Sequence, residues 1–233
     1  MYPVGILAGG LATRLHPITT FMPKSLIPIN NRPFIDWQLE HLARSGITRV
    51  VLLVGHLGNL IESYVGDGSR YGLLVEYSYD GDTQMGTGGA VIKALPLLGD
   101  CFAITYGDSY LPMNFSSAEG KFRESGKLGL MSIYRNQNPA HRNNVKYEQG
   151  KIIRYSKGSA YIDMNHIDYG FNLFKADAFG PYSENAPLGL AQVSEDLSIK
   201  GELEGFEVEK TFFEIGSFEG IAALVEELKG KTE

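Results

Sequence analysis

The sequence of 233 residues contains one cysteine, Cys101, no long apolar run and no excess of basic residues. A single cysteine excludes an intramolecular disulfide and is typical of a protein in a reducing cytosol. No apolar run approaches the ~20 residues that a membrane-spanning helix needs, and the first residues lack the pattern of a signal peptide. The formal net charge of -6 argues against binding to nucleic acid or an anionic membrane. We therefore expect a soluble, cytoplasmic protein without these partners.

The composition favours one folded unit. Hydrophobic residues make up 43% of the chain, which is enough to build a core at this length. No segment rich in Pro, Gly or Ser divides the sequence, so we predict a single domain over residues 1–233. With an acidic chain, any phosphate site must be built locally, from a few basic side chains and backbone amides.

Apolar runs alternate with amphipathic stretches through the first half of the chain. This alternation predicts βαβ units, hence an α/β fold whose parallel sheet has helices on both faces. Ligands of such sheets bind beyond the carboxyl ends of the strands, so chemistry is expected in the loops after Leu7, Tyr79 and Tyr106. The expected strands are Val4–Leu7, Val50–Val54, Leu73–Tyr79, Cys101–Tyr106 and Leu128–Tyr134, and the expected helices are Phe34–Ser45, Leu57–Val65, Gly88–Leu98 and Phe115–Ser125.

The second half of the chain is less regular. A hairpin is predicted from Asn144 to Tyr155, with its turn at Gln149 and Gly150. Further strands are expected at Tyr169–Phe174 and Thr211–Ile215, and an amphipathic helix at Phe218–Lys229.

The loop after the first strand is the strongest functional signal. Gly9 and Gly10 follow the strand directly, and Arg14 and Lys24 add positive charge nearby. An isolated Gly-Gly pair is most often a tight turn, but a long basic loop at the carboxyl end of a strand favours phosphate binding. The spacing is neither that of a P-loop nor that of a dinucleotide fingerprint.

Residues 5–35 carry several further fixed points. They are Leu7-Ala8-Gly9-Gly10, Thr13-Arg14-Leu15, Pro17 with Thr19, Pro23-Lys24 and Pro33. This pattern resembles the signature of sugar-1-phosphate nucleotidyltransferases, the NDP-sugar pyrophosphorylases, and is most similar in look to short bacterial heptose- and mannose-1-phosphate guanylyltransferases. The resemblance implies a Rossmann-like, mostly parallel mixed sheet with helices on both faces.

The resemblance also implies roles for individual residues. Arg14, Lys24 and Asp108 would be catalytic, and Asp108 would hold Mg²⁺ together with Glu214. In the family the position of Glu214 is usually a shorter Asp or Asn. The nucleotide would be bound by Leu7, Ala8, Gly9, Gly10, Thr13, Arg14, Lys24, Gly86 and Thr87.

Four residues match family segments that contact the acceptor. They are Asn144, Lys157, Asp168 and Glu195. The implied reaction joins an NTP and a sugar 1-phosphate to give an NDP-sugar and pyrophosphate, with GTP and heptose or mannose 1-phosphate as the best match. Two alternatives stay open: a cytidylyltransferase for a phosphorylated non-sugar, and a catalytically silent nucleotide-binding regulator. The sequence leaves the base, the acceptor and the oligomeric state open, a homo-oligomer included.

Overall fold

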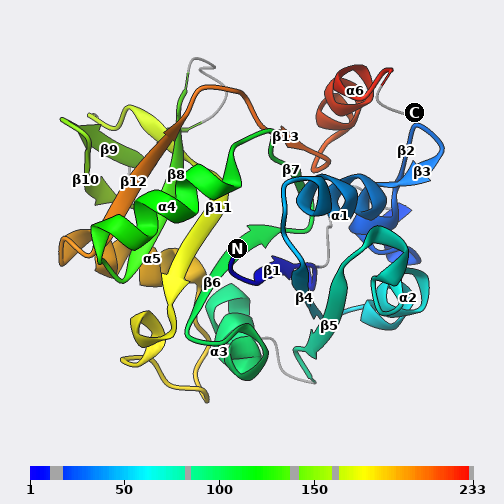
Figure 1. The fold of residues 1–233 in the computed structure, drawn as a ribbon, viewed down its shortest axis with the longest axis horizontal. Coiled ribbons are helices and arrows are strands. Elements are labelled where there is room, and N and C mark those ends of the chain that lie inside the picture. Colours follow the sequence, from blue (N-terminus) through cyan, green and yellow to red (C-terminus); the bar gives the residue numbers. More distant parts are fainter. Residues whose placement is uncertain (11–17, 82–84, 137–141, 159–162, 231–233) are drawn as a thin grey trace.

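The computed structural model describes residues 1–10, 18–81, 85–136, 142–158 and 163–230. Its central sheet has the strand order β10-β9-β11-β6-β1-β4-β5, and β8 joins β11 to β12 (Figure 1). The strands are β1 (Val4–Leu7), β4 (Arg49–Val54), β5 (Leu74–Tyr79), β6 (Cys101–Tyr106), β8 (Gly129–Arg135), β9 (Val145–Glu148), β10 (Lys151–Tyr155), β11 (His166–Lys175) and β12 (Leu203–Val208).

The sheet is mixed, as predicted. Strand β1 pairs in parallel with β4 and β6, and β4 pairs in parallel with β5. Strand β11 runs antiparallel to β6, β8 and β9, and β9 runs antiparallel to β10. Because β1, β4, β5 and β6 are parallel, their carboxyl ends meet at one edge of the sheet.

Helices cover both faces of the sheet. They are α1 (Phe34–Arg44), α2 (Gly58–Val65), α3 (Gly86–Leu98), α4 (Phe115–Ser125), α5 (Leu190–Ile199) and α6 (Phe218–Glu227). Along β4 the side chains alternate: Val50 and Leu52 enter the core shared with α1, α2 and α4, whereas Leu53 enters the core shared with α3 and α5. A strand buried on both faces reads as a continuous apolar run, which is why this part was predictable.

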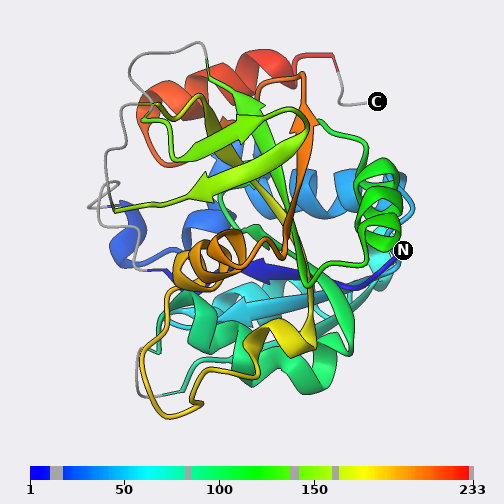
Figure 2. The ribbon, with the colours of Figure 1, turned by 90° about the vertical axis from the view of Figure 1, so that its left-hand side faces the viewer.

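A smaller third cluster lies beside the main sheet. It joins α1 and α6 to the short pairs β2 (Pro28–Ile29) with β3 (Arg32–Pro33) and β7 (Ser109–Tyr110) with β13 (Phe213–Glu214). Trp37, Ile215 and Leu224 are fully buried in it. Helices α6 and α3 lie at opposite ends of the molecule in both views (Figures 1 and 2).

The second half of the chain differs most from prediction. The hairpin is confirmed, and its turn has φ of 51° at Gln149 and 79° at Gly150, as a two-residue turn of this type requires. The predicted strand Thr211–Ile215 is wrong in length, since only Phe213–Glu214 pair, with β7. Helix α5 and strand β12 were not predicted.

Candidate active site

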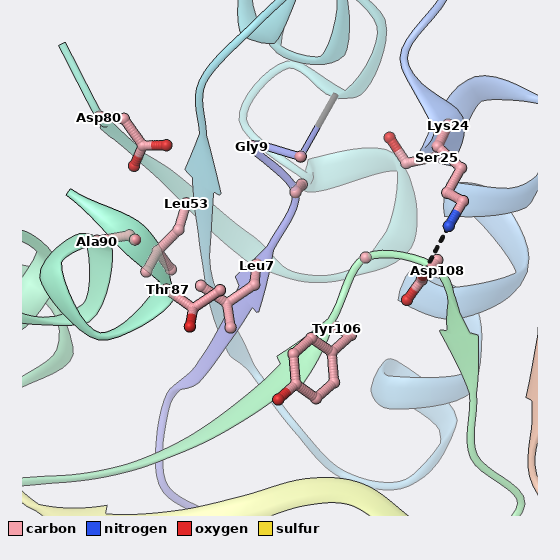
Figure 3. A pocket seen from close by; sticks show the side chains of 14 residues that line it. Leu7, Gly9, Lys24, Ser25, Leu53, Asp80, Thr87, Ala90, Tyr106 and Asp108 are labelled. Atoms are coloured by element: carbon pink, nitrogen blue, oxygen red, sulfur yellow. Dashed lines mark hydrogen bonds and ion pairs between the residues drawn. The ribbon is translucent and has the colours of Figure 1, made fainter. Parts of the chain in front are cut away.

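A cavity of about 530 Å³ opens at the carboxyl ends of β1 and β6, where the sequence places its chemistry. The strands, α3 and a one-turn 3-10 helix at Lys24–Leu26 all contribute to its wall. Its lining is Leu7, Ala8, Gly9, Gly10, Lys24, Ser25, Leu53, Asp80, Gly86, Thr87, Ala90, Tyr106, Gly107 and Asp108 (Figure 3).

Gly9 and Gly10, the two glycines of the first loop, differ in the space around them. A Cβ on Gly9 would lie 2.6 Å from Asp80 Oδ2 and 3.1 Å from the Gly55 nitrogen, so only a hydrogen fits there. Gly10 is exposed, and a Cβ on it would meet no described atom within 4 Å. Its lack of a side chain leaves the backbone accessible from the cavity. Thr13 and Arg14 lie outside the described residues, so their roles stay predictions.

Lys24 and Asp108 form an ion pair at one end of the cavity. Lys24 Nζ lies 2.6 Å from Asp108 Oδ2, with the two side chains 16% and 29% exposed (Figure 3). The sequence predicted both residues without placing them in contact. The carboxylate therefore holds the lysine ammonium in position beside the cavity.

Glu214, although far later in the sequence, belongs to the strand β13 that pairs with β7 directly after Asp108. It lies opposite Ser109 in the β13–β7 pair, and the Ile215 N–H donates to the Asp108 carbonyl at 2.9 Å. Burial raises the pKa of Tyr106, and the charges of Asp168, Asp108 and Glu214 raise it further. Within the described residues no cluster of three His, Cys, Asp or Glu side chains is arranged to hold a metal ion.

Asp80 and Ser25 line the cavity and were not singled out in the sequence. The Ser25 hydroxyl is buried and has no hydrogen-bond partner among the described residues. Asp80 directly follows β5, in one of the three loops expected to carry chemistry, so its position was a signal. Figure 3 shows it across the cavity from Lys24 and Asp108. The cavity thus has the Lys24–Asp108 ion pair at one end and the Asp80 carboxylate at the other.

The environment of Asp80 predicts how the stability of the fold depends on pH. Burial raises the pKa of Asp80, and the ammonium of Lys93 offsets part of this shift. The folded protein then binds this proton more tightly than the unfolded chain, so stability falls as pH rises through the interval between 3.8 and the raised pKa. We expect Asp80→Asn to melt at a higher temperature than wild type at neutral pH, by about 2–4 °C for each kcal/mol gained.

Thermal melts of wild type and Asp80→Asn at neutral pH and below pH 3.8 measure this effect, and the difference should shrink at the lower pH. Asp100→Asn, on an exposed side chain, is the matched control. A lower melting temperature of Asp80→Asn at neutral pH would contradict the assignment of a desolvated carboxylate.

The second glycine-rich segment forms the start of α3, two residues earlier than predicted. Gly88 and Gly89 donate their N–H groups to the Leu188 carbonyl, at 2.8 and 3.2 Å. Thr87 Oγ1 accepts a hydrogen bond from the Leu190 N–H at 2.9 Å, so Thr87 caps the start of α5. The segment that precedes α5 therefore packs on α3, while Gly86 and Thr87 still line the cavity.

The four predicted acceptor residues lie outside the cavity lining, toward β9, β10 and β11. Asn144 Oδ1 accepts from the Asp168 N–H, and Asp168 Oδ1 accepts from the Gly170 N–H. Burial raises the pKa of Asp168, and the hydrogen bonds from the Gly170 N–H and the Asn172 amide, with a smaller contribution from the charge of Lys157, lower it in part. Glu195 pairs with Arg154 at 3.6 Å. Asn144 and Asp168 are thus in direct contact, and a Cβ on Gly170 would lie 3.5 Å from the ring of Tyr106, which lines the main cavity.

Comparison with known proteins bears on this arrangement. The family model described as nucleotidyl transferase matches residues 4–154, more than half of the chain and all strands of the cavity. The chain belongs to the nucleotidyl transferase family. The resemblance inferred from residues 5–35 is thereby confirmed.

Relatives in this family include N-acetylmuramate alpha-1-phosphate uridylyltransferase of Neisseria meningitidis, 38% identical over 48% of this chain and 49% of that protein. D-glycero-alpha-D-manno-heptose 1-phosphate guanylyltransferase of Campylobacter jejuni is 29% identical over 76% of this chain and 78% of that protein. The chain spans about half the length of several curated relatives, 48% and 49% in two of them.

The fold is also that of solved structures. A Bacillus anthracis protein solved in complex with sucrose matches with a TM-score of 0.87 and 20% identity, over 99% of this chain and 96% of that one. This likeness confirms the predicted fold class. Among the described residues, no helix is long and apolar enough to cross a membrane.

Proposed function

We propose that residues 1–233 act as one nucleotidyltransferase unit that transfers NMP from an NTP to a sugar 1-phosphate, giving an NDP-sugar and pyrophosphate. The observation that carries this proposal is the two-ended cavity, with the Lys24–Asp108 pair at one end and the Asp80 carboxylate at the other. Such a cavity suits a ligand with phosphates at one end and hydrogen-bond donors at the other. Membership of the nucleotidyl transferase family supports the same reaction.

The chain's own residues would position the substrates and neutralise charge. An oxygen of the acceptor phosphate attacks the α-phosphorus, the bond to the bridging oxygen of the β-phosphate breaks, and pyrophosphate leaves. The acceptor phosphate is already ionised, so no side chain has to remove a proton. Lys24, the amides of the Gly9–Gly10 loop and the predicted Arg14 would stabilise the negative charge on the departing pyrophosphate.

The donor set near Asp108 fits a magnesium ion. Asp108 and Glu214 are carboxylates on backbone segments joined by the Ile215–Asp108 hydrogen bond, and Glu214 lies opposite Ser109, the residue after Asp108, in the β13–β7 pair. Mg²⁺ prefers oxygen ligands and usually takes one or two carboxylates, with substrate phosphates and water completing its shell. When bound, Mg²⁺ would supply positive charge next to the reacting phosphates.

Asp80 favours guanine over the other bases. Guanine presents two adjacent N–H donors on its pairing edge, which match the two oxygens of a carboxylate. Uracil and thymine present one donor between two carbonyl oxygens, which a carboxylate repels. Cytosine and adenine present one amino group beside a ring acceptor. We therefore assign GTP as the nucleotide, in agreement with those relatives that are named guanylyltransferases.

The acceptor would lie on the Asp168 side of Tyr106. The Asp168 carboxylate is held by the Gly170 N–H and the Asn172 amide, so it can accept hydrogen bonds from sugar hydroxyls in a fixed direction. Asn144 fixes its backbone, and the exposed ammonium of Lys157 suits the acceptor phosphate. This arrangement suits a sugar 1-phosphate in general, and the names of two relatives favour heptose or mannose 1-phosphate. Glu195 would act through its pair with Arg154.

The base assignment predicts a change of nucleotide preference. Asp80→Asn replaces one acceptor oxygen by an amino donor, which matches uracil or thymine better than guanine. We expect the ratio of kcat/KM for GTP to that for UTP to fall by about 10–100-fold, since a bidentate contact contributes about 1–3 kcal/mol of base discrimination. Steady-state pyrophosphate release with each NTP measures the ratio, with Asp100→Asn as control. An unchanged ratio would remove Asp80 from base recognition.

A further inference from the structure

The turn that carries Asp108 is held by backbone hydrogen bonds from two neighbouring strands. Gly107 donates its N–H to the Leu7 carbonyl at 2.9 Å, which ties the turn to β1. The Asp108 carbonyl accepts from the Ile215 N–H, also at 2.9 Å, which ties it to β13 and thus to Glu214. Both proposed metal ligands therefore depend on the position of one turn.

A third contact comes from helix α1. Gln38 is 4% exposed, and its Nε2 donates to the Tyr106 carbonyl at 2.8 Å and to the Ser109 carbonyl at 3.0 Å. These two carbonyls stand on either side of Gly107 and Asp108. The single amide nitrogen thus uses both of its hydrogens to hold the two ends of the turn together.

The Gln38 amide oxygen, unlike the amide nitrogen, contributes no hydrogen bond to the described structure. This atom, Oε1, is buried and has no hydrogen-bond partner among the described residues. Turning the amide over would place this oxygen against two carbonyl oxygens, so the orientation is fixed by the network. A buried acceptor without a partner costs stability, which a leucine or methionine at the same place would avoid. The amide is therefore poorly explained by core packing alone.

We propose that Gln38 is a positioning residue that fixes the Tyr106–Ser109 turn and thereby the Asp108 carboxylate. Gln38 does not line the main cavity and acts on Asp108 through the backbone carbonyls of Tyr106 and Ser109. The inference rests on the proposed function, because it assigns Asp108 a role in metal and nucleotide binding. The proposal gives a functional role to a residue of α1, a helix whose other buried side chains mostly pack in the hydrophobic core.

The test compares Gln38→Met with Leu39→Met. Gln38→Met keeps the side-chain length and removes both donors together with the unpartnered oxygen. Leu39→Met changes a fully buried neighbour on the same helix at nearly constant volume. We expect Gln38→Met to lower kcat and Mn²⁺ affinity by about 10–100-fold, as loss of a residue that orients a metal ligand does. The KM for the sugar 1-phosphate should stay within about twofold, since its residues lie elsewhere.

Two readouts do not depend on turnover. Electron paramagnetic resonance titration of Mn²⁺ with a non-hydrolysable GTP analogue measures metal affinity, and hydrogen exchange measures opening of the Tyr106–Ser109 turn. Gln38→Met should speed exchange at this turn while Leu39→Met does not. Gln38→Leu, which also removes both donors and introduces no charge, should have the same effects and serves if the Met variant folds poorly.

Unchanged metal affinity and exchange in folded Gln38→Met would overturn the proposal, as would an equal loss in Leu39→Met. Failure of the proposed function has a different signature. In that case the wild-type chain releases no pyrophosphate, while exchange at the turn still reports whether Gln38 holds it.

Discussion

Lys24→Ala is expected to lower kcat by about 10²–10³-fold while the protein stays folded. The Lys24 ammonium is held 2.6 Å from Asp108 at the edge of the cavity, so its charge is already in place when the phosphates arrive. Loss of one such preorganised donor to developing charge typically costs about 3–4 kcal/mol. Pyrophosphate release under saturating substrates measures kcat, and circular dichroism verifies the fold.

Two control variants sharpen this result. Lys24→Arg keeps the positive charge and should retain more activity than Lys24→Ala. It should stay below wild type, because a planar guanidinium does not reproduce the contacts of a compact ammonium. Lys151→Ala removes an exposed lysine at the start of β10 and should be silent. Turnover of folded Lys24→Ala close to wild type would exclude Lys24 from the reaction.

Asp108→Asn is expected to have the largest effect, a loss of at least about 1000-fold in kcat. The substitution keeps the shape of the side chain and removes its negative charge. A bound cation contributes several kcal/mol of charge stabilisation, and each ~1.4 kcal/mol is a factor of ten in rate. Calorimetric titration of Mg²⁺ into the protein with a non-hydrolysable GTP analogue should show a matching loss of metal affinity.

The same variant tests the ion pair from its other side. In wild type, Asp108 competes with phosphate for the Lys24 ammonium. Asp108→Asn removes this competitor, so the analogue should bind more tightly than to wild type when a chelator keeps metal away. Weaker binding under chelation, together with unchanged Mg²⁺ affinity, would contradict the assignment of Asp108 as a metal ligand.

The parts of the fold that follow local rules could be predicted from the sequence. Arg49–Val54 is a strand because both of its faces are buried, and Gln149 and Gly150 form the turn because it needs positive φ at both positions. Lys24 and Asp108 were identified through resemblance to a family. Their contact could not be predicted, because it joins segments 84 residues apart.

The missed features depend on tertiary contacts. Helix α5 begins after a glycine that offers no side-chain cap, and its first N–H is satisfied by Thr87 from another helix. The strand expected at Thr211–Ile215 is cut short because, within the part of the chain that the structure describes, it pairs only with the two-residue β7. Asp80 belongs to no recognised motif; the sequence indicates its loop, but the contact of its carboxylate with Gly9 and Gly55 is visible only in the fold.

The central claim is tested most directly by mixing the wild-type chain with Mg²⁺, one NTP and one acceptor phosphate, and measuring pyrophosphate. The panel pairs GTP, UTP, dTTP, CTP and ATP with heptose, mannose and glucose 1-phosphates and with a phosphorylated amino alcohol. We predict that pyrophosphate release requires both substrates, is fastest with GTP and heptose or mannose 1-phosphate, and matches NDP-sugar formation one for one. Release only with CTP and the amino alcohol phosphate, or no release with any pair, would contradict the account.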